Sequence, residues 1–416
     1  MRTLIFGGTI KSVIQEFEKK FDVVCKINTI KDLEKDYDLE DLIKNNFNFT
    51  PAFDQDAQNL FINFYKKNFN IFCRMFIRRG VKLSDYHELS NHFAIFFYCF
   101  FEILKKKKIQ LIIFNNLPHH GLDFILYKIA KILEIKTVLL TQSIFPNKYI
   151  MISNLLDFGK FKNENNTYDK KVVNKIISVK DYYTDYQSKW EKEIKKLNLL
   201  PSSPILLEDA KNIKKPDVIK KIKDIVLKLL IFLNFIKREN LQKKFEENIS
   251  SLELNNEEVS RVLEKKNKKI FLAFHSQPEM STSLLAGDYD DQIRIIEKLQ
   301  RKKIADTFDI LVREHPIQTF YQRDEFFFRR LKYLNNIKIL NRNFPIDKII
   351  ASSDVIVTCS GTIGWEGLLS GKKCLLFGES WYSNLYGVLK INDETRDDEI
   401  LNFLQEEFDY LYLQLK

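Results

Sequence analysis

The chain has 416 residues, of which 45% are hydrophobic and 29% charged, and its formal net charge is +10 at pH 7. This composition is that of an ordinary globular protein, and the 12 glycines and 9 prolines exclude collagen-like and linker-like sequences. No zinc-finger or RNA-binding signature accompanies the basic charge, so we expect no nucleic-acid partner. The basic charge can attract an anionic lipid or an anionic substrate, or it can belong to solvated helix faces that bind nothing.

Targeting and redox features indicate a cytoplasmic protein, with peripheral attachment to a membrane surface as an alternative. The N-terminus is better explained by a strand than by a signal peptide. The longest apolar runs, 93–104 and 225–236, have about 12 residues each, whereas a bilayer span needs roughly 18–20. No CxxC pair occurs, which indicates buried thiols in a reducing compartment. The five cysteines are Cys25, Cys73, Cys99, Cys359 and Cys374.

The first third of the chain predicts alternating strands and helices. An apolar strand over 2–8 ends in glycines, and residues 40–108 have a helical, Phe-rich pattern. The remaining predicted elements are strands over 22–27, 109–116 and 136–143 and a helix over 121–135. Short apolar strands separated by helices are typical of a parallel sheet.

Residues 155–265 are polar and rich in Lys, Asn and Glu, which indicates a helical insertion. Within them, 218–239 is an apolar run flanked by basic residues. This pattern is typical either of a helix packed on the protein's own core or of one resting on an anionic membrane surface.

A second alternating series begins near residue 268. It predicts strands over 268–275, 308–316, 337–342, 354–361 and 372–378, and helices over 289–303, 326–336, 344–353 and 362–371. We therefore expect an α/β protein with two Rossmann-like domains facing a cleft and a helical insertion between them. The expected parts are 1–155, 156–265, 266–395 and a C-terminal helix over 396–416.

Polar clusters follow the strands of this second series, where α/β domains bind ligands. Ser360 and Thr362 flank Gly361 directly before a predicted helix. Backbone N–H groups, the helix dipole and two hydroxyls would suit a phosphate. Ordinary helix capping by Ser or Thr is the alternative.

Two further strand ends carry candidate catalytic groups. His315 and Pro316 end one strand, and a histidine there can bind or protonate a phosphate, or simply face solvent. Glu279, presented by Pro278, can act as a nucleophile, a base or a ribose ligand.

The first domain has a polar loop after the strand over 109–116. It contains His119, His120 and Asp123. Adjacent histidine side chains diverge and no third ligand is obvious, so we expect no metal here. A loop that holds an acceptor hydroxyl is the alternative that we favour.

Several stretches together resemble the capsular polysaccharide biosynthesis proteins of bacteria. They are "NLPHHGLDFILYKIAKILEIKTVLLTQSIFP", "FHSQPEMSTSLLAGDYDDQ", "LVREHP" and "DVIVTCSGTIGWEGLLSGKKCLLFGESWY", within roughly 109–150 and 268–390. That group is similar to Kdo-type and other nonulosonic-acid glycosyltransferases of the GT-B architecture.

The resemblance implies a CMP-activated acidic sugar as donor, a glycan or glycolipid as acceptor, and no further cofactor or metal. It implies that His315, Ser360 and Thr362 contact the CMP phosphate and that Glu366 contacts the ribose or cytosine. The other donor-binding candidates are Gln277, Arg313, Pro316 and Gly361.

The resemblance also places Glu279 near the donor sugar, where it would act as the nucleophile of a retaining transfer. Similar retaining enzymes present an aspartate in the corresponding region, whereas this chain has "HSQPE". Asp123 and His119 are the alternative bases for an inverting transfer. A nucleotide-sugar epimerase and a non-catalytic glycan-binding protein of capsule assembly are the alternative functions.

Overall fold

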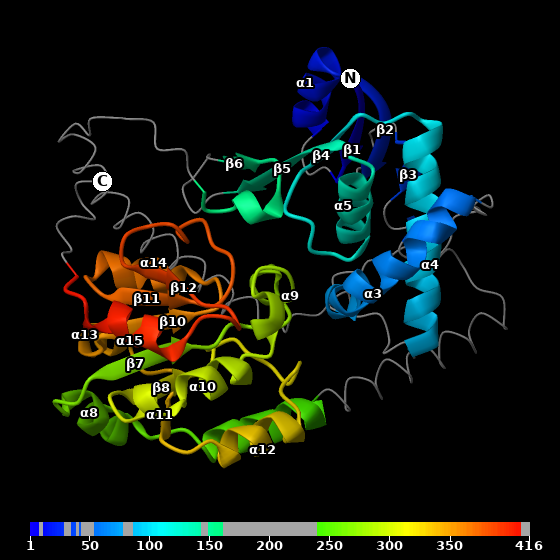
Figure 1. Ribbon diagram of the computed structural model, residues 1–416. Helices are drawn as coiled ribbons and strands as arrows, with labels where there is room; N and C mark the ends of the chain where they lie inside the picture. The colour runs from blue at the N-terminus through cyan, green and yellow to red at the C-terminus, as the bar shows by residue number, and fades with distance from the viewer. Residues whose placement is uncertain are drawn as a thin grey trace, which may run out of the picture. The chain divides into compact units, whose positions relative to one another are not determined.

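The computed structural model describes residues 1–7, 11–28, 35–38, 41–42, 54–77, 86–142, 149–160 and 239–408. These residues form two compact units, one ending at residue 160 and one beginning at residue 239. Each unit is built on a six-stranded sheet flanked by helices (Figure 1). Most of the predicted insertion, including the apolar run 218–239 up to residue 238, lies outside the described residues.

The first sheet has the strand order β3-β2-β1-β4-β5-β6. Its strands are β1 (Arg2–Phe6), β2 (Asp22–Asn28), β3 (Tyr37–Asp38), β4 (Leu111–Phe114), β5 (Lys136–Gln142) and β6 (Tyr149–Ile152). All neighbours pair in parallel except β5 with β6. The order from β3 to β5 is that of a Rossmann fold.

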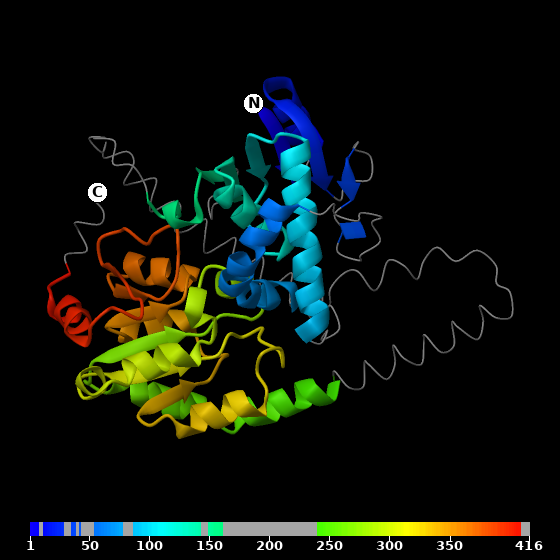
Figure 2. The ribbon, with the colours of Figure 1, turned by 45° about the vertical axis from the view of Figure 1, so that its right-hand side comes forward.

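The described helices beside this sheet are α1 (Lys11–Lys20), α3 (Gln55–Ile77), α4 (Tyr86–Lys106) and α5 (Leu122–Ile132), with a 3-10 turn η1 (Leu155–Asp157). The long helices α3 and α4 cross each other (Figures 1 and 2). Their Phe-rich faces meet there, as in the pair Phe64 and Phe97, whose ring centroids are 4.7 Å apart. This packing explains the high Phe content of the region.

The second sheet is entirely parallel, in the order β12-β11-β10-β7-β8-β9. Its strands are β7 (Lys269–Ala273), β8 (Asp309–Arg313), β9 (Ile337–Leu340), β10 (Val355–Thr358), β11 (Lys373–Leu376) and β12 (Val388–Lys390). Its helices are α8 (Asn256–Glu264), α9 (Met280–Ser283), η3 (Gly287–Asp290), α10 (Ile293–Leu299), α11 (Lys302–Ala305), α12 (Glu325–Tyr333), α13 (Ile346–Ser352), α14 (Thr362–Leu369) and α15 (Asp397–Gln405).

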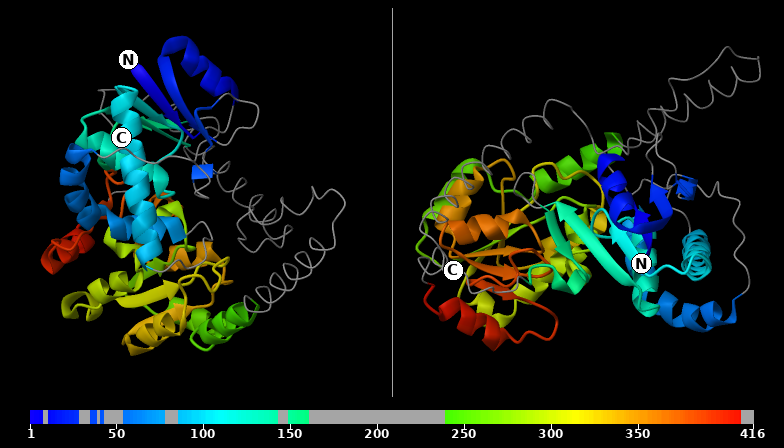
Figure 3. Two further views of the ribbon diagram at one scale, coloured as in Figure 1. Left: turned by 90° about the vertical axis from the view of Figure 1, so that its right-hand side faces the viewer. Right: turned by 90° about the horizontal axis from the view of Figure 1, so that it is seen from above.

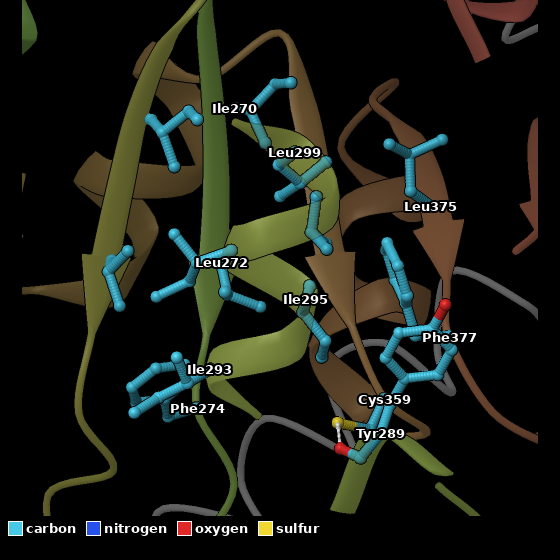
Figure 4. Packing of buried hydrophobic residues seen from close by; sticks show 14 of the residues in the cluster. Ile270, Leu272, Phe274, Tyr289, Ile293, Ile295, Leu299, Cys359, Leu375 and Phe377 are labelled. Atoms are coloured by element: carbon cyan, nitrogen blue, oxygen red, sulfur yellow. Dashed lines mark hydrogen bonds between the residues drawn. The ribbon is translucent and has the colours of Figure 1, made fainter. Parts of the chain in front are cut away.

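Both faces of this sheet are buried, because successive strand residues point to opposite faces. In β7, Ile270 and Leu272 lie in one core cluster and Phe271 lies in the other. Figure 4 shows the first cluster, in which the Cys359 thiol donates to the Tyr289 carbonyl oxygen at 3.5 Å. All five cysteines are free thiols, and four of them are buried.

Residues 239–264 pack against the second sheet. The helical residues 239–250 lie beside α12 (Figure 3), where the Phe245 and Phe328 ring centroids are 5.9 Å apart. Helix α8 begins with a reciprocal pair of bonds between Asn255 and Glu258, a capping box. The fold class of two Rossmann-like domains is confirmed, while the predicted domain boundaries stay predictions.

One predicted helix is wrong in its extent. Residues 289–303 do not form a single helix, because the chain there divides into η3, α10 and α11. Tyr289 has non-helical backbone angles, and its side chain packs in the core on Phe377. Among the described helices, none combines the length and the apolarity that crossing a bilayer requires.

Candidate functional site

The polar loops of the second unit lie at one edge of its sheet. Strands β7, β8, β10 and β11 are parallel, so the loops that follow them leave from the same side. The polar residues that follow β7, β8 and β10 therefore share one edge of the sheet. This edge is where doubly wound domains bind their ligands.

The loop from β10 into α14 has the features of an anion site. Gly361 is the N-cap of α14, and no side chain bonds to the first turn of the helix. The Ser360 hydroxyl instead donates to the Ser281 carbonyl oxygen at 2.7 Å, and the Thr362 hydroxyl to the Glu366 carboxylate at 3.2 Å. Ordinary capping by these two hydroxyls is thus ruled out. The Gly364 N–H donates to the Gly361 carbonyl oxygen at 3.2 Å, whereas the N–H groups of Thr362 and Ile363 have no intrahelical partner within the described residues.

His315 lies directly after β8. Burial lowers its pKa to about 4, with Arg313 and Arg323 acting in the same direction and Glu314 opposing them. The backbone N–H of Ile317 donates to His315 Nδ1 at 3.4 Å. The ring is therefore neutral at pH 7 and carries its proton on Nε2, which makes no hydrogen bond within the described part of the chain. A neutral ring with this tautomer offers a single N–H donor.

A buried ion pair between Glu314 and Arg323 stabilises the loops at this edge. The Arg323 guanidinium donates to both Glu314 oxygens, at 2.7 and 3.3 Å, and both side chains are 1% exposed. Arg323 also bonds to the Gln277 side-chain oxygen and stacks over the Phe327 ring at 4.3 Å. A cation held this way fixes the strand ends that carry Gln277 and His315.

Two glutamines complete the network. Gln292 donates to the Gln277 side-chain oxygen at 2.9 Å and accepts the His275 backbone N–H at 2.6 Å. Gln318 accepts the Gln277 backbone N–H at 2.7 Å. Gln277 is therefore a buried structural member of the site rather than a side chain offered to a ligand.

Sequence reasoning did not assign Arg323, Gln292, Gln318 or Thr358 to the site, although Gln292 and Thr358 lie within the quoted stretches. Their partners are far away along the chain: Arg323 bonds to Gln277 and Gln292 to His275.

Glu279 begins helix α9 as its N-cap. Its carboxylate accepts a hydrogen bond from the Ser281 hydroxyl at 3.4 Å, and its side chain is half-buried. Ser281 also accepts from Ser360, so the turn that carries Glu279 is tied to the loop before α14. The structure brings Glu279 and the anion loop into one local assembly.

The remaining donor-binding candidates differ in position. The Arg313 guanidinium donates to the Arg342 carbonyl oxygen at 3.1 and 2.6 Å, so it is directed to the end of β9. Pro316 is exposed on the β8 loop, and Glu366 is half-buried one turn into α14. Of these three, Glu366 lies on the same helix as the anion loop.

In the first unit, Asp123 orders its own loop. Its two carboxylate oxygens accept backbone N–H groups of His119 at 2.9 Å, His120 at 2.7 Å and Phe124 at 2.8 Å. The side chain is buried, and His119 Nδ1 donates to the Leu117 carbonyl oxygen at 2.5 Å. Within the described residues, no group of three or more His, Cys, Asp or Glu side chains is arranged to hold a metal ion.

Comparison with known proteins supports the resemblance over the second unit. Residues 233–394 match the family model of the capsule polysaccharide biosynthesis proteins, which confirms the resemblance over that segment. The match does not extend to 109–150. No curated protein matches the chain.

Solved structures match at low similarity. The beta Kdo 2,4 transferase KpsC of Thermosulfurimonas dismutans matches at 16% identity with a TM-score of 0.27, covering 40% of this chain and 54% of that one. The chain thus spans about half the length of that transferase. The UDP-GlcNAc 2-epimerase of Methanocaldococcus jannaschii matches at 13% identity with a TM-score of 0.27, covering 98% of this chain and 94% of that one.

Proposed function

Because residues 233–394 match a capsule polysaccharide biosynthesis family, we propose that the chain is a glycosyltransferase. Its donor is a CMP-activated acidic sugar of the Kdo, pseudaminic, legionaminic or sialic acid type, and its acceptor is a surface glycan or glycolipid. The observation that carries the proposal is the pairing, at one sheet edge, of the uncapped N-terminus of α14 with the His315 Nε2 donor.

This pairing suits a leaving phosphate. When the bond between the anomeric carbon and the phosphate oxygen breaks, the electron pair stays on the phosphate of CMP. N–H donors fixed in advance at that position stabilise the developing charge. The N–H groups of Thr362 and Ile363 in the first turn of α14 and the ring N–H of His315 are such donors. The Ser360 and Thr362 hydroxyls lie in the same loop and donate to Ser281 and to Glu366.

We further propose retention through Glu279. Its carboxylate attacks the anomeric carbon as the bond to the CMP phosphate breaks. The acceptor oxygen then displaces the carboxylate, and the proton of the acceptor hydroxyl passes to solvent. The bond from Ser360 to Ser281 supports this role, because it holds the Glu279 turn against the phosphate loop. A nucleophile on the same domain as the phosphate site is held close to the donor sugar rather than to the acceptor.

Nucleotide binding tests the donor class. In calorimetry with CMP, UDP and GDP, CMP should bind most tightly, and at 100 times its Kd it should raise the free energy of unfolding by about 2.7 kcal/mol. Tighter binding of UDP would favour the epimerase alternative. Binding of a glycan but of no nucleotide would favour a non-catalytic assembly protein.

Mutants test the stereochemistry. Glu279→Gln should abolish transfer and leave CMP affinity nearly unchanged. Mass spectrometry of the wild type with donor and no acceptor should show a sugar adduct on the peptide 271–283. Retention is wrong if Asp123→Asn or His119→Ala is the inactive variant and the product has the anomeric configuration opposite to that of the donor.

An anionic membrane surface is a further proposed partner, supported by the net charge of +10 and by the basic residues around 218–239. Co-sedimentation with liposomes at low salt, with and without anionic lipid, tests it. Absence of binding to anionic vesicles would remove this partner.

A further inference from the structure

A second imidazole lies against the anion loop, and the proposed function does not use it. His275 follows β7 and is 8% exposed. A Cβ placed on Gly361 would come within 2.7 Å of His275 Cε1 and 3.0 Å of Nε2. The edge of the ring therefore contacts the N-cap residue of α14, and only glycine leaves room for it there.

Hydrogen bonds determine which ring nitrogen of His275 carries the proton. Nε2 lies 2.7 Å from the Thr358 hydroxyl oxygen, which also accepts the Gly361 N–H at 3.1 Å. Thr358 is fully buried, and of its two partners only the imidazole can accept the hydroxyl proton. Thr358 therefore donates to Nε2, and the His275 proton resides on Nδ1.

The two histidines then have complementary tautomers. His315 holds its proton on Nε2, because Ile317 occupies Nδ1. His275 holds its proton on Nδ1, next to the Cε1 atom that faces Gly361. Neither proton has an acceptor within the described residues, and a positive charge on His315 would lower the pKa of His275.

We propose that His275 Nδ1–H is a second imidazole donor to the donor phosphate, which is thus held between two neutral histidines at the N-terminus of α14. This inference rests on the proposed function, since it takes a phosphate of the donor as the ligand. Thr358 acts as a positioning residue, because it fixes the His275 tautomer without touching the phosphate.

Burial explains why the donors are neutral. It lowers the pKa of His275 to about 3, with His315 and Arg323 acting in the same direction. Glu314 is already paired with Arg323 and is therefore not available to hold a second cation. Two neutral N–H donors bind a phosphate by hydrogen bonding without placing a full positive charge in a buried site.

The tautomers predict a crossover between conservative variants. An Asn amide nitrogen takes the position of a histidine Nδ1, and a Gln amide nitrogen that of Nε2. His275→Asn should therefore retain CMP affinity better than His275→Gln, whereas His315→Gln should retain it better than His315→Asn. The weaker variant of each pair should lose about 10- to 100-fold in affinity, the effect of one hydrogen bond to a charged group.

Calorimetry with CMP, with circular dichroism to confirm folding, measures this crossover. Equal affinities of His275→Gln, His275→Asn and the wild type would overturn the inference and leave the proposed function standing. If the wild type binds no CMP, the proposed function fails, and the same variants titrated with inorganic phosphate decide the role of His275. Binding of neither CMP nor phosphate overturns both.

Gly361→Ala gives a second measurement if a histidine variant fails to fold. The added methyl group would displace the His275 ring, so phosphate affinity should fall as it does in His275→Gln. Because both changes remove the same contact, the double variant Gly361→Ala/His275→Gln should bind phosphate no more weakly than either single variant. Additive losses would show that Gly361 acts independently of His275 and would contradict the inference.

Discussion

The strand-end loops of the two units use hydrogen bonds in opposite ways. In the first unit, Asp123 accepts backbone N–H groups from residues one, three and four positions away. In the second unit, the bonds join distant parts of the chain: His275 to Thr358 spans 83 positions and Ser360 to Ser281 spans 79. Local bonds shape one loop, whereas long-range bonds fix several loops relative to one another.

This difference suggests a division of roles within each unit. The Asp123 carboxylate is surrounded by its own loop, which stabilises that loop's conformation. In the second unit the buried network leaves two ring N–H groups directed away from it. A preorganised donor site needs such support, because its groups must not rearrange as charge develops.

Removing the buried cation should break the second unit most severely. Arg323→Met leaves the Glu314 carboxylate buried and unpaired, and we expect a loss of about 3–5 kcal/mol in the free energy of unfolding. Urea denaturation measures it. The matched control is Arg330→Met, since Arg330 pairs with Asp291 and Glu297 at the surface and should change stability by less than about 1 kcal/mol.

The double variant Arg323→Met/Glu314→Gln sharpens this result. It removes both charges, so it should recover part of the stability that Arg323→Met loses. Equal stabilities of Arg323→Met and Arg330→Met would show that the ion pair does not hold the strand ends together.

Acid should weaken the second unit through its histidines. Burial lowers the pKa of His275 to about 3 and that of His315 to about 4, against an ordinary value near 6.5. Below about pH 6 the unfolded chain binds protons that the folded chain does not. The free energy of unfolding therefore decreases as the pH is lowered, by about 1.4 kcal/mol per pH unit for each histidine. The loss continues until pH reaches the folded pKa values.

Urea denaturation between about pH 7 and pH 5 measures this slope. The double variant His275→Gln/His315→Gln is the comparison, because it lacks both groups and retains the other titrating residues. Its stability should depend on pH less steeply than that of the wild type by about 2–3 kcal/mol per pH unit at most. Parallel curves would mean that the two rings titrate normally.

Asp123→Ala should destabilise the first unit and leave the second unit unchanged. The backbone N–H groups of His119 and His120 lose a charged acceptor, and we expect about 1–3 kcal/mol of destabilisation. CMP affinity should stay within about twofold of the wild type, because the phosphate loops belong to the other unit. A large loss of CMP affinity would show that Asp123 acts beyond its own loop.

The fold could be predicted further than the site. Apolar strands such as 109–116 and 354–361 are marked by local composition, and both sheets are parallel over these strands as expected. The motifs around His315, Ser360 and Glu279 were found because each combines a strand end with unusual polar residues. The His275 tautomer depends on Thr358 and Gly361, which only the folded chain brings to it.

The misassigned helix over 289–303 has a similar cause. Its apolar residues have helical spacing, yet Tyr289 is fixed outside helical geometry, and its hydroxyl donates to Asp393 at 2.8 Å. Burial and this bond raise the pKa of Tyr289. A contact 104 positions away decides the backbone there, and no local pattern carries that information.

The smallest effect is expected from the bond that joins Glu279's turn to the phosphate loop. Ser360→Ala removes a hydroxyl that donates to the Ser281 carbonyl oxygen, and stability should fall by only about 1 kcal/mol. CMP affinity should fall about 3- to 10-fold, since the loop before α14 loses its link to α9.

Ser370→Ala is the matched control for this bond. The Ser370 hydroxyl also donates to a backbone carbonyl oxygen, that of Glu366 at 2.8 Å, but the bond is exposed and lies within four residues. Removing it should change neither stability nor CMP affinity measurably, because water replaces the partner. If Ser360→Ala and Ser370→Ala behave alike in both measurements, the long-range bond has no more effect than a local one, and the contrast between the two kinds of loop does not extend to ligand binding.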